Sequence, residues 1–219
     1  DCPQLYAPLR QWAQNLHRAG VPNLVTIAPT PQLFDDGLGS GRSVVDIWTM
    51  LPKMYEAAGA NVERARQKGD ALWSYNSLVQ DGYSPKWQID FSPLDFRIQP
   101  GFLSQSLGLK GLLYWRVDLW TSDPWNNLRT FNNGERWFYG DGMLVYPGAQ
   151  VGVASSVASM RLKWLRDGVE DYDYVQILKR LGHGSQALTA SHQAAVSWHT
   201  WTREPAVITR VRQQLGWLT

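Results

Sequence analysis

Apolar runs of strand length alternate with helical patterns through the first half of the chain, and this order constrains its fold more than any other feature. Five runs rich in β-branched and aromatic residues are predicted to be strands: LVTIA at 24–28, VVDIWTM at 44–50, ALWSYN at 71–76, WQIDF at 87–91 and GLLYWRVDLW at 111–120. These runs are apolar rather than alternating in polarity, as expected for parallel strands that helices cover. The strand–helix–strand order predicts an α/β fold with a parallel sheet or barrel.

Helical periodicity fills the gaps between these runs. One helix is predicted over 6–16, with Gly20 as its stop, and another over 53–68, with Gly69 as its stop. A third helix is expected over 94–107.

An apolar stripe at three- and four-residue steps predicts a long amphipathic helix that starts after Ser155 or Ser156 and ends at Gly182. The stripe consists of Val157, Met160, Trp164, Leu165, Val169, Tyr172, Val175, Leu178 and Leu181. The charged residues of this helix have both signs, which is typical of a face that is exposed or paired with neighbouring loops. The helix is therefore expected to be architectural.

An aromatic, glycine-punctuated loop leads into this helix, and residues 140–178 together form a recognisable pattern. Its defining residues are Gly140, Asp141, Gly142, Leu144, Tyr146, Pro147, Gly148, Ser159, Arg161, Leu162, Leu165, Arg166, Asp167, Gly168, Glu170, Asp171 and Tyr172. The pattern resembles the C-terminal signature of the glycoside hydrolase 123 family, also known as DUF4091, barrel enzymes typified by β-N-acetylgalactosaminidases. Shorter matches at LVT, VDIW, LWSYNS and GLLYW extend the resemblance over nearly the whole chain.

The resemblance implies the later half of a (β/α)8 TIM-like barrel over residues 1–184, followed by a C-terminal helical extension at 185–219 that packs on the barrel. The earlier strands would lie upstream of Asp1, so the partner of this segment would be the missing N-terminal half of its own barrel. The length agrees with this expectation, because 219 residues lie near the bottom of the size range of a complete barrel. A fragment is therefore expected.

Composition argues against several classes of function. The formal charge is +2, with 21 basic and 19 acidic residues and no basic run, so neither a nucleic acid nor an anionic membrane is an expected partner. No apolar run reaches transmembrane length, and no membrane insertion is expected. One cysteine and four histidines without HxxxH spacing predict no intrachain disulfide, no metal site and no cofactor. The compartment stays open, and a secreted or periplasmic parent protein is compatible with the sequence.

Twelve Trp, nine Tyr and six Phe form the one compositional extreme, which either a Trp-rich core or a sugar site could explain. In a barrel, active-site groups lie at the C-terminal ends of strands and in the loops that follow. The residues there that are predicted to bind a carbohydrate are Trp48, Trp73, Tyr75, Trp115, Asp118, Trp120 and Trp125. Core packing competes for Trp73 and Trp115, whereas Trp120 and Trp125, beside polar residues, are harder to explain as core.

Catalysis in the resembled family uses the 2-acetamido oxygen of the substrate as the nucleophile. An adjacent Asp-Glu pair, typically followed by Pro, serves the reaction: the Asp orients the acetamido group and the Glu is the acid/base. Here the chain opens with Asp1, Cys2 and Pro3, a little upstream of the helix that leads into LVT. The resemblance therefore implies that Asp1 is the orienting Asp and that Cys2 replaces the acid.

The catalytic carboxylates have two further candidate positions. The true pair could lie before Asp1, with the match at Asp-Cys-Pro arising by chance. Asp118 or Asp46 could also supply acid chemistry in a divergent site, although Asp46 is as well explained by a structural hydrogen-bonding role. Asp90 is disfavoured because a Pro-containing turn follows it.

The resemblance implies a domain that hydrolyses β-linked N-acetylhexosamine glycans, of the N-acetylgalactosamine type, by a substrate-assisted retaining mechanism. The complete parent chain would then be a glycosidase of the β-N-acetylhexosaminidase type. A noncatalytic carbohydrate-binding or structural barrel remnant, without the acid/base pair, is the alternative.

Overall fold

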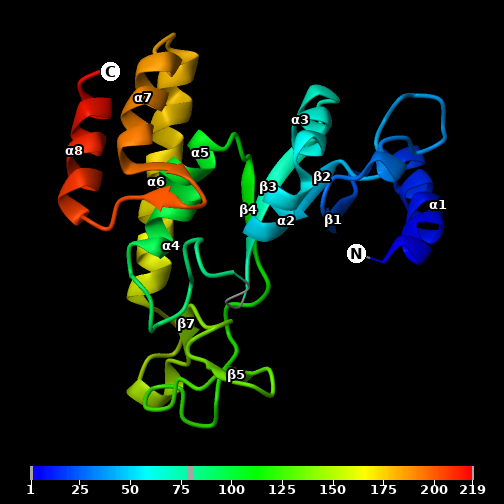
Figure 1. The fold of residues 1–219 in the computed structure, drawn as a ribbon. Coiled ribbons are helices and arrows are strands. Elements are labelled where there is room, and N and C mark those ends of the chain that lie inside the picture. Colours follow the sequence, from blue (N-terminus) through cyan, green and yellow to red (C-terminus); the bar gives the residue numbers. More distant parts are fainter. Residues whose placement is uncertain (1, 78–80, 219) are drawn as a thin grey trace. The chain divides into compact units, whose positions relative to one another are not determined.

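The computed structural model describes residues 2–77 and 81–218, in which the chain falls into two compact units (Figure 1). Unit 1 extends to Tyr75 and includes Leu109–Leu113. Unit 2 comprises Asn76–Gly108 and the chain from Tyr114 onward.

A four-stranded sheet forms the centre of unit 1. Its strands are β1 (Leu24–Thr26), β2 (Ile47–Met50), β3 (Ala71–Asn76) and β4 (Gly111–Tyr114), in the order β1-β2-β3-β4. β1 pairs with β2 and β2 with β3 in parallel. In this register Trp48 lies opposite Leu72, and Thr49 lies opposite Trp73. The predicted mixed α/β class with a parallel sheet is confirmed.

Helices accompany these strands. α1 (Tyr6–Arg18), after the 3-10 turn η1 (Pro3–Leu5), precedes β1, and the 3-10 turn η2 (Pro31–Leu33) lies between β1 and β2. α2 (Pro52–Ala58) and α3 (Ala60–Gln67) connect β2 to β3. The prediction of one continuous helix over 53–68 is wrong, because Gly59 adopts φ +52° and ψ −126° and separates α2 from α3. A residue without Cβ reaches positive φ at little steric cost, so the break falls at the glycine.

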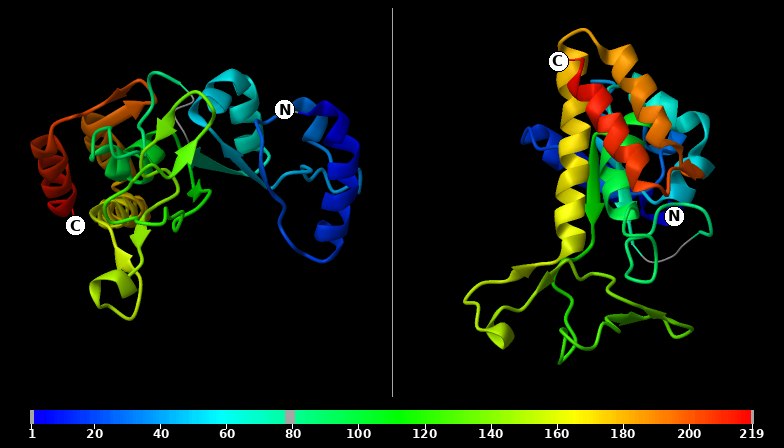
Figure 2. Two further views of the ribbon diagram at one scale, coloured as in Figure 1. Left: turned by 90° about the horizontal axis from the view of Figure 1, so that it is seen from below. Right: turned by 90° about the vertical axis from the view of Figure 1, so that its left-hand side faces the viewer.

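A helical layer built on α6 (Met160–Arg180) forms one part of unit 2. α7 (Gly184–Ala194) and α8 (Pro205–Gly216) lie beside α6 (Figure 2), and the antiparallel strands β9 (Ala195–Ser197) and β10 (Thr200–Trp201) connect α7 to α8. Three short segments replace the continuous helix predicted over 94–107: α4 (Asp95–Ile98), the π-helical η3 (Gln99–Leu103) and α5 (Ser104–Ser106). They also pack against α6.

Glycines and a buried ion pair hold α6 against this neighbouring layer. A Cβ at Gly168 would lie 2.3 Å from the Arg97 carbonyl oxygen, and a Cβ at Gly101 would lie 2.9 Å from the Gly168 carbonyl oxygen. The buried Asp171 carboxylate accepts hydrogen bonds from Arg97 Nε at 2.7 Å and Nη2 at 3.1 Å, and from Arg212 Nη1 at 3.1 Å. The backbone of α6 at Gly168 lies so close to the Arg97 carbonyl oxygen that a Cβ does not fit there, which explains the glycine in the middle of the signature helix.

The prediction that Ser155 or Ser156 caps this helix is wrong. Ser159 is the N-cap, and its Oγ accepts a hydrogen bond from the Leu162 N–H at 3.2 Å. The helix starts later than expected because Val157–Ala158 forms strand β8 instead of a first helical turn.

Loops with two short hairpins make up the rest of unit 2. β5 (Phe131–Asn132) pairs with β6 (Trp137–Phe138), β7 (Val145–Tyr146) pairs with β8, and η4 (Ala149–Val151) is a 3-10 turn. The strand predicted over 111–120 ends early, at Tyr114. Beyond Tyr114 the backbone bonds to the loop of the 140s instead, with Leu119 N donating to Gly142 O at 2.8 Å and Leu144 N donating to Val117 O at 2.7 Å.

The weakest predicted strand, WQIDF at 87–91, does not form. Trp87 is buried and stacks on Phe96, with ring centroids 5.7 Å apart, and Ile89 N donates to Tyr139 O at 3.1 Å. Aromatic packing thus explains the apolar character of this run without a sheet ladder.

Two predictions of organisation stay predictions: the later half of a (β/α)8 barrel, and a boundary between residues 184 and 185. Among the described residues, no helix has both the length and the apolar character needed to cross a membrane.

Candidate functional site

Exposed and half-buried indole rings gather in the loops of unit 2, and the N–H groups of two of them donate to backbone carbonyls. Trp120 is 41% exposed, yet its Nε1 donates to the Val145 carbonyl oxygen at 2.8 Å. Trp125 Nε1 donates to the Pro147 carbonyl oxygen at 3.0 Å, and its ring stacks on Tyr146 with centroids 4.5 Å apart. Both acceptors belong to the LVYPG part of the signature loop. We call Trp115, Trp120, Trp125 and Tyr146 the aromatic surface.

Two glycines of the same loop are closely packed, and one of them, Gly142, lies against the third indole, Trp115. Gly142 has φ +72°, and a Cβ there would lie 2.7 Å from Cζ2 of Trp115 and 3.1 Å from Cβ of Leu119. Gly140, with φ +70°, would place a Cβ 2.5 Å from Cδ1 of Ile89. Both positions combine a left-handed backbone with close packing, so only glycine fits them.

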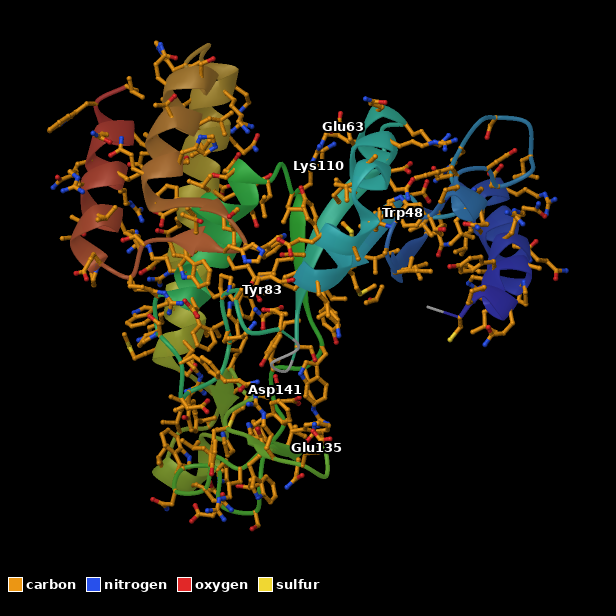
Figure 3. The ribbon with its side chains drawn as sticks, viewed as in Figure 1. Trp48, Glu63, Tyr83, Lys110, Glu135 and Asp141 are labelled. Carbon is orange, nitrogen blue, oxygen red and sulfur yellow. The ribbon has the colours of Figure 1, made fainter. Side chains whose placement is uncertain are left out.

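Asp141, between these glycines, is fully buried and holds the loop from inside (Figure 3). Its Oδ1 accepts a hydrogen bond from the Tyr114 hydroxyl at 3.2 Å, and that hydroxyl accepts one from the Gly142 N–H at 2.7 Å. Burial, with the nearby Asp141 charge, raises the pKa of Tyr114 above its usual value, so the phenol stays neutral and remains a donor. The GDG motif therefore joins the end of β4 to the loop.

Arg161 connects the aromatic surface to the signature helix. Its Nη2 donates to the Met143 carbonyl oxygen at 2.7 Å, and its guanidinium carbon lies 5.8 Å from the centroid of the Tyr146 ring. Sequence reasoning did not assign Arg161 or Tyr146 to the site. The signal was present, since both are defining residues of the 140–178 pattern, but they were interpreted as architecture alone.

Asp118 lies in the same loops, in an isolated antiparallel bridge with Met143. Its carboxylate is half exposed and accepts a hydrogen bond from Arg116 Nε at 2.9 Å. The structure thus brings together Asp118, Trp115, Trp120 and Trp125 within one loop region of unit 2. Substrate binding by these four residues stays a prediction.

The three remaining candidates lie in unit 1, on two different faces of the sheet. The parallel register places Trp73, with Tyr75 two residues on, on the face of Thr49, and places Trp48 on the opposite face with Leu72. The Trp73 ring lies against the backbone of Gly111, where a Cβ would be 2.3 Å from Cε2. Trp73 and Tyr75 are half-buried and keep their predicted roles as predictions.

Trp48 belongs to the core of unit 1 (Figure 3). Its ring is fully buried, packs edge-on against Phe34 at 5.7 Å, and donates from Nε1 to Asp70 Oδ2 at 2.9 Å. No face of this indole is open to a ligand in the described structure, so packing accounts for Trp48. The geometry gives no support to its predicted contact with substrate.

Asp46 takes the structural role that competed with acid chemistry. Its Oδ2 lies 3.0 Å from His17 Nε2 and accepts the Asn23 N–H at 2.6 Å, while Oδ1 accepts Arg42 Nε at 2.6 Å. His17 Nδ1 lies 2.7 Å from Asp36 Oδ2. Burial opposes the ionisation of Asp36, but hydrogen bonds from the Leu38 N–H and His17 outweigh it and lower the pKa of Asp36. This network ties α1 to the segment before β2.

Asp1, the predicted orienting residue, lies outside the described residues. Cys2 is exposed and its thiol is free. Asp90, disfavoured from the sequence, is exposed in a turn. Within residues 2–77 and 81–218, no group of three or more His, Cys, Asp or Glu side chains is placed to hold a metal ion.

Comparisons with known proteins agree on one family. A family model described as "Glycoside hydrolase 123, catalytic domain" matches residues 28–178. A solved structure, a family 123 glycoside hydrolase from Clostridium perfringens studied for glycolipid glycan hydrolysis, has a similar fold, with a TM-score of 0.59 at 12% identity. The similarity covers 97% of this chain but 43% of that one, so the chain spans less than half of that relative. No curated protein sequence gave a match.

Proposed function

Because the chain belongs to the glycoside hydrolase 123 family, we propose that it supplies the sugar-binding loops of a glycosidase that acts on β-linked N-acetylhexosamine glycans, of the N-acetylgalactosamine type. The observation that carries this proposal is the aromatic surface. Trp120 is exposed and Trp125 is half-buried, and the N–H groups of both are already bonded to backbone carbonyls.

This arrangement suits a pyranose. The C–H face of a sugar packs on a flat apolar ring, and its hydroxyl groups need polar partners at the rim. Asp118 and Arg116 lie in the same segment as Trp115 and Trp120, and both side chains are substantially exposed. Hydrogen bonds that fix the rings before a ligand arrives reduce the entropy lost on binding.

The fold is proposed to be the later half of a (β/α)8 barrel, with β1 to β4 as four of its strands. The parallel pairing of β1, β2 and β3 and the partial coverage of a family member support this proposal. The barrel would then be completed by an N-terminal half, and residues 185–219 would be a helical extension packed on it. On this arrangement, Trp73 and Tyr75 belong to the strand face that carries Thr49.

The proposed chemistry is substrate-assisted retaining hydrolysis, in which the acetamido oxygen attacks the anomeric carbon. Asp1 is proposed to orient the acetamido group, and the acid/base either precedes it or has been replaced by Cys2. A noncatalytic sugar-binding domain is the second candidate, and it is favoured by Cys2, which follows Asp1 where the family typically has its acidic Glu.

Turnover of an aryl β-N-acetylhexosaminide by the complete parent protein tests the proposal. Trp120→Ala should lower kcat/KM by about tenfold or more, because one aromatic face contributes roughly 1 to 3 kcal/mol of contact. Trp12→Ala is the matched control, since this indole is 63% exposed on α1. Equal activity of all three proteins would contradict the proposal.

The parent protein also distinguishes the two candidates. Sugar binding without turnover, with some activity restored by Cys2→Glu, would identify a noncatalytic domain that has lost its acid. Strong native turnover that survives Asp1→Asn would place the catalytic pair elsewhere.

A further inference from the structure

A cavity of about 340 Å³ opens in unit 2 beside the start of α8. Its wall consists of Ser92, Pro93, Leu94, Arg97, Trp164, Arg203 and Pro205, and it shares no residue with the aromatic surface. The volume falls in the lower part of the range of ligand pockets, roughly 300 to 1,000 Å³, so the cavity has room for one ring with a substituent.

The polar side chains of this wall offer hydrogen-bond donors, and none of its described residues carries a carboxylate. Arg97 uses Nε and Nη2 on Asp171, so its Nη1 makes no hydrogen bond to a described residue. Arg203 is 57% exposed, and its Nη1 lies 3.8 Å from Asp95 Oδ1, beyond hydrogen-bond distance. The half-buried Ser92 adds a hydroxyl. A ligand of this cavity therefore has to supply acceptors.

The positive charge at the cavity is only partly neutralised from the protein side. Asp171 is shared with Arg212 Nη1 at 3.1 Å. Asp95 accepts the Lys86 N–H at 2.8 Å and Trp201 Nε1 at 3.1 Å. Because each carboxylate also serves other donors, both arginines of the wall keep part of their field, which suits a monoanion better than a dianion.

An apolar face lies beside these donors. Trp164 is half-buried on α6, and its indole makes no hydrogen bond or ring contact with a described residue. Leu94, Pro93 and Pro205 complete the apolar part of the wall. A ring gains contact with such a surface, whereas a small hydrated ion gains none. A carboxylate on a ring joins this contact to two acceptor oxygens, which guanidinium groups bind well.

We propose that this cavity binds a carboxylate carried on a small ring, with Arg97 Nη1 and the Arg203 guanidinium donating to the carboxylate oxygens and the ring packed along Trp164. A sugar acid and an aromatic acid share this chemistry, since each presents an apolar face next to the same anion. The site does not depend on glycoside hydrolysis or on the sugar contacts proposed for Trp120 and Trp125.

The test follows the indole N–H signal of Trp164 by NMR in the native chain, with the signal assigned by its loss in Trp164→Phe. The probes are D-glucuronate and benzoate, and their neutral analogues are glucose and benzamide. At least one carboxylate should shift the signal in a saturable way, and the tighter of the two identifies the kind of ring. The neutral analogues should not shift it, and sulfate should bind roughly tenfold or more weakly, because it has no ring to pack on Trp164.

Arg203→Gln should weaken binding of the carboxylate by roughly threefold to tenfold, because a charge-assisted hydrogen bond is lost at a largely exposed site. Arg210→Gln is the matched control: it makes the same charge change at an exposed position of α8 that does not line the cavity, and it should leave the affinity unchanged. If Arg203→Gln does not fold, Arg203→Lys keeps the charge but loses the planar donor fork, and it should weaken binding by roughly twofold or more.

Trp120→Ala keeps this result separate from the aromatic surface, since it should leave the Trp164 response to the carboxylates unchanged. Dependence of that response on Trp120 would place the binding elsewhere and overturn the proposal. It is also overturned by a Trp164 signal that ignores both carboxylates, by equal binding of sulfate or a neutral analogue, or by full affinity in the Arg203 variant.

Discussion

Trp125 donates its indole N–H to the carbonyl oxygen of Pro147 across 3.0 Å, which joins a candidate sugar-binding ring to the YPG segment of the signature loop. Trp120 makes the equivalent bond to Val145, and Trp115 packs on Gly142. A loop that shows no catalytic group in the sequence therefore positions three indole rings. The signature is a scaffold for the aromatic surface.

Gly142→Ala should disturb this scaffold in two ways. The substitution strains a backbone at φ +72° and brings a Cβ within 2.7 Å of the Trp115 ring. We expect a loss of roughly 2 to 4 kcal/mol in unfolding free energy, measured by urea denaturation, and weaker sugar binding.

Gly134→Ala separates the two causes. Gly134 also has positive φ, +95°, but nothing lies within 4 Å of its Cβ position. The control should cost about 1 kcal/mol and leave sugar affinity unchanged. Equal effects of the two substitutions would mean that contact with Trp115 does not matter.

Asp171→Ala should destabilise unit 2 far more than Asp167→Ala. Asp171 is fully buried and pairs with Arg97 and Arg212, so its loss leaves the partly buried Arg97 without this carboxylate, whereas Arg212 keeps Glu170, and should cost about 3 to 5 kcal/mol. Asp167 pairs with the exposed Arg166 and should contribute less than about 1 kcal/mol. Thermal melts of both variants test the ranking, and a larger loss from Asp167→Ala would contradict it.

Acid should destabilise the protein partly through Asp36. The pKa of this carboxyl is lowered from its usual 3.8, because hydrogen bonds from Leu38 N–H and His17 outweigh the effect of burial. A carboxyl with a lower pKa in the folded state contributes stability above its unfolded pKa and loses it as the pH falls through the folded value. Asp36→Asn should therefore flatten the decline in unfolding free energy below about pH 4. An unchanged slope in urea titrations would count against this account.

The sequence predicts the order of β1 to β4 and the long helix because apolar runs and three- and four-residue steps are local features. It does not show that Trp48, a predicted sugar-binding residue, is buried, because a run that is apolar throughout does not indicate which face of β2 turns toward the core. Only pairing with β3 decides this, by placing Trp48 opposite the buried Leu72 and Thr49 opposite Trp73. Face assignment depends on the tertiary structure.

The loop contacts could not be predicted for a similar reason. The bonds from Trp120 to Val145 and from Trp125 to Pro147 join positions more than twenty residues apart in segments without periodicity. The polar neighbours of these two indoles in the sequence indicated that core packing does not explain them. The sequence did not show that the signature loop holds them, or that Arg161 contacts the same loop.

Binding of N-acetylgalactosamine to the native chain, Trp120→Ala and Trp12→Ala, measured by isothermal titration calorimetry, tests the central claim most directly. Trp120→Ala should bind roughly tenfold or more weakly at an unchanged melting temperature, because alanine cannot replace a stacked ring. Trp12→Ala, which removes another exposed indole from α1, should bind as the native chain does. Identical affinity in all three proteins would contradict the assignment of the aromatic surface as the sugar-binding site.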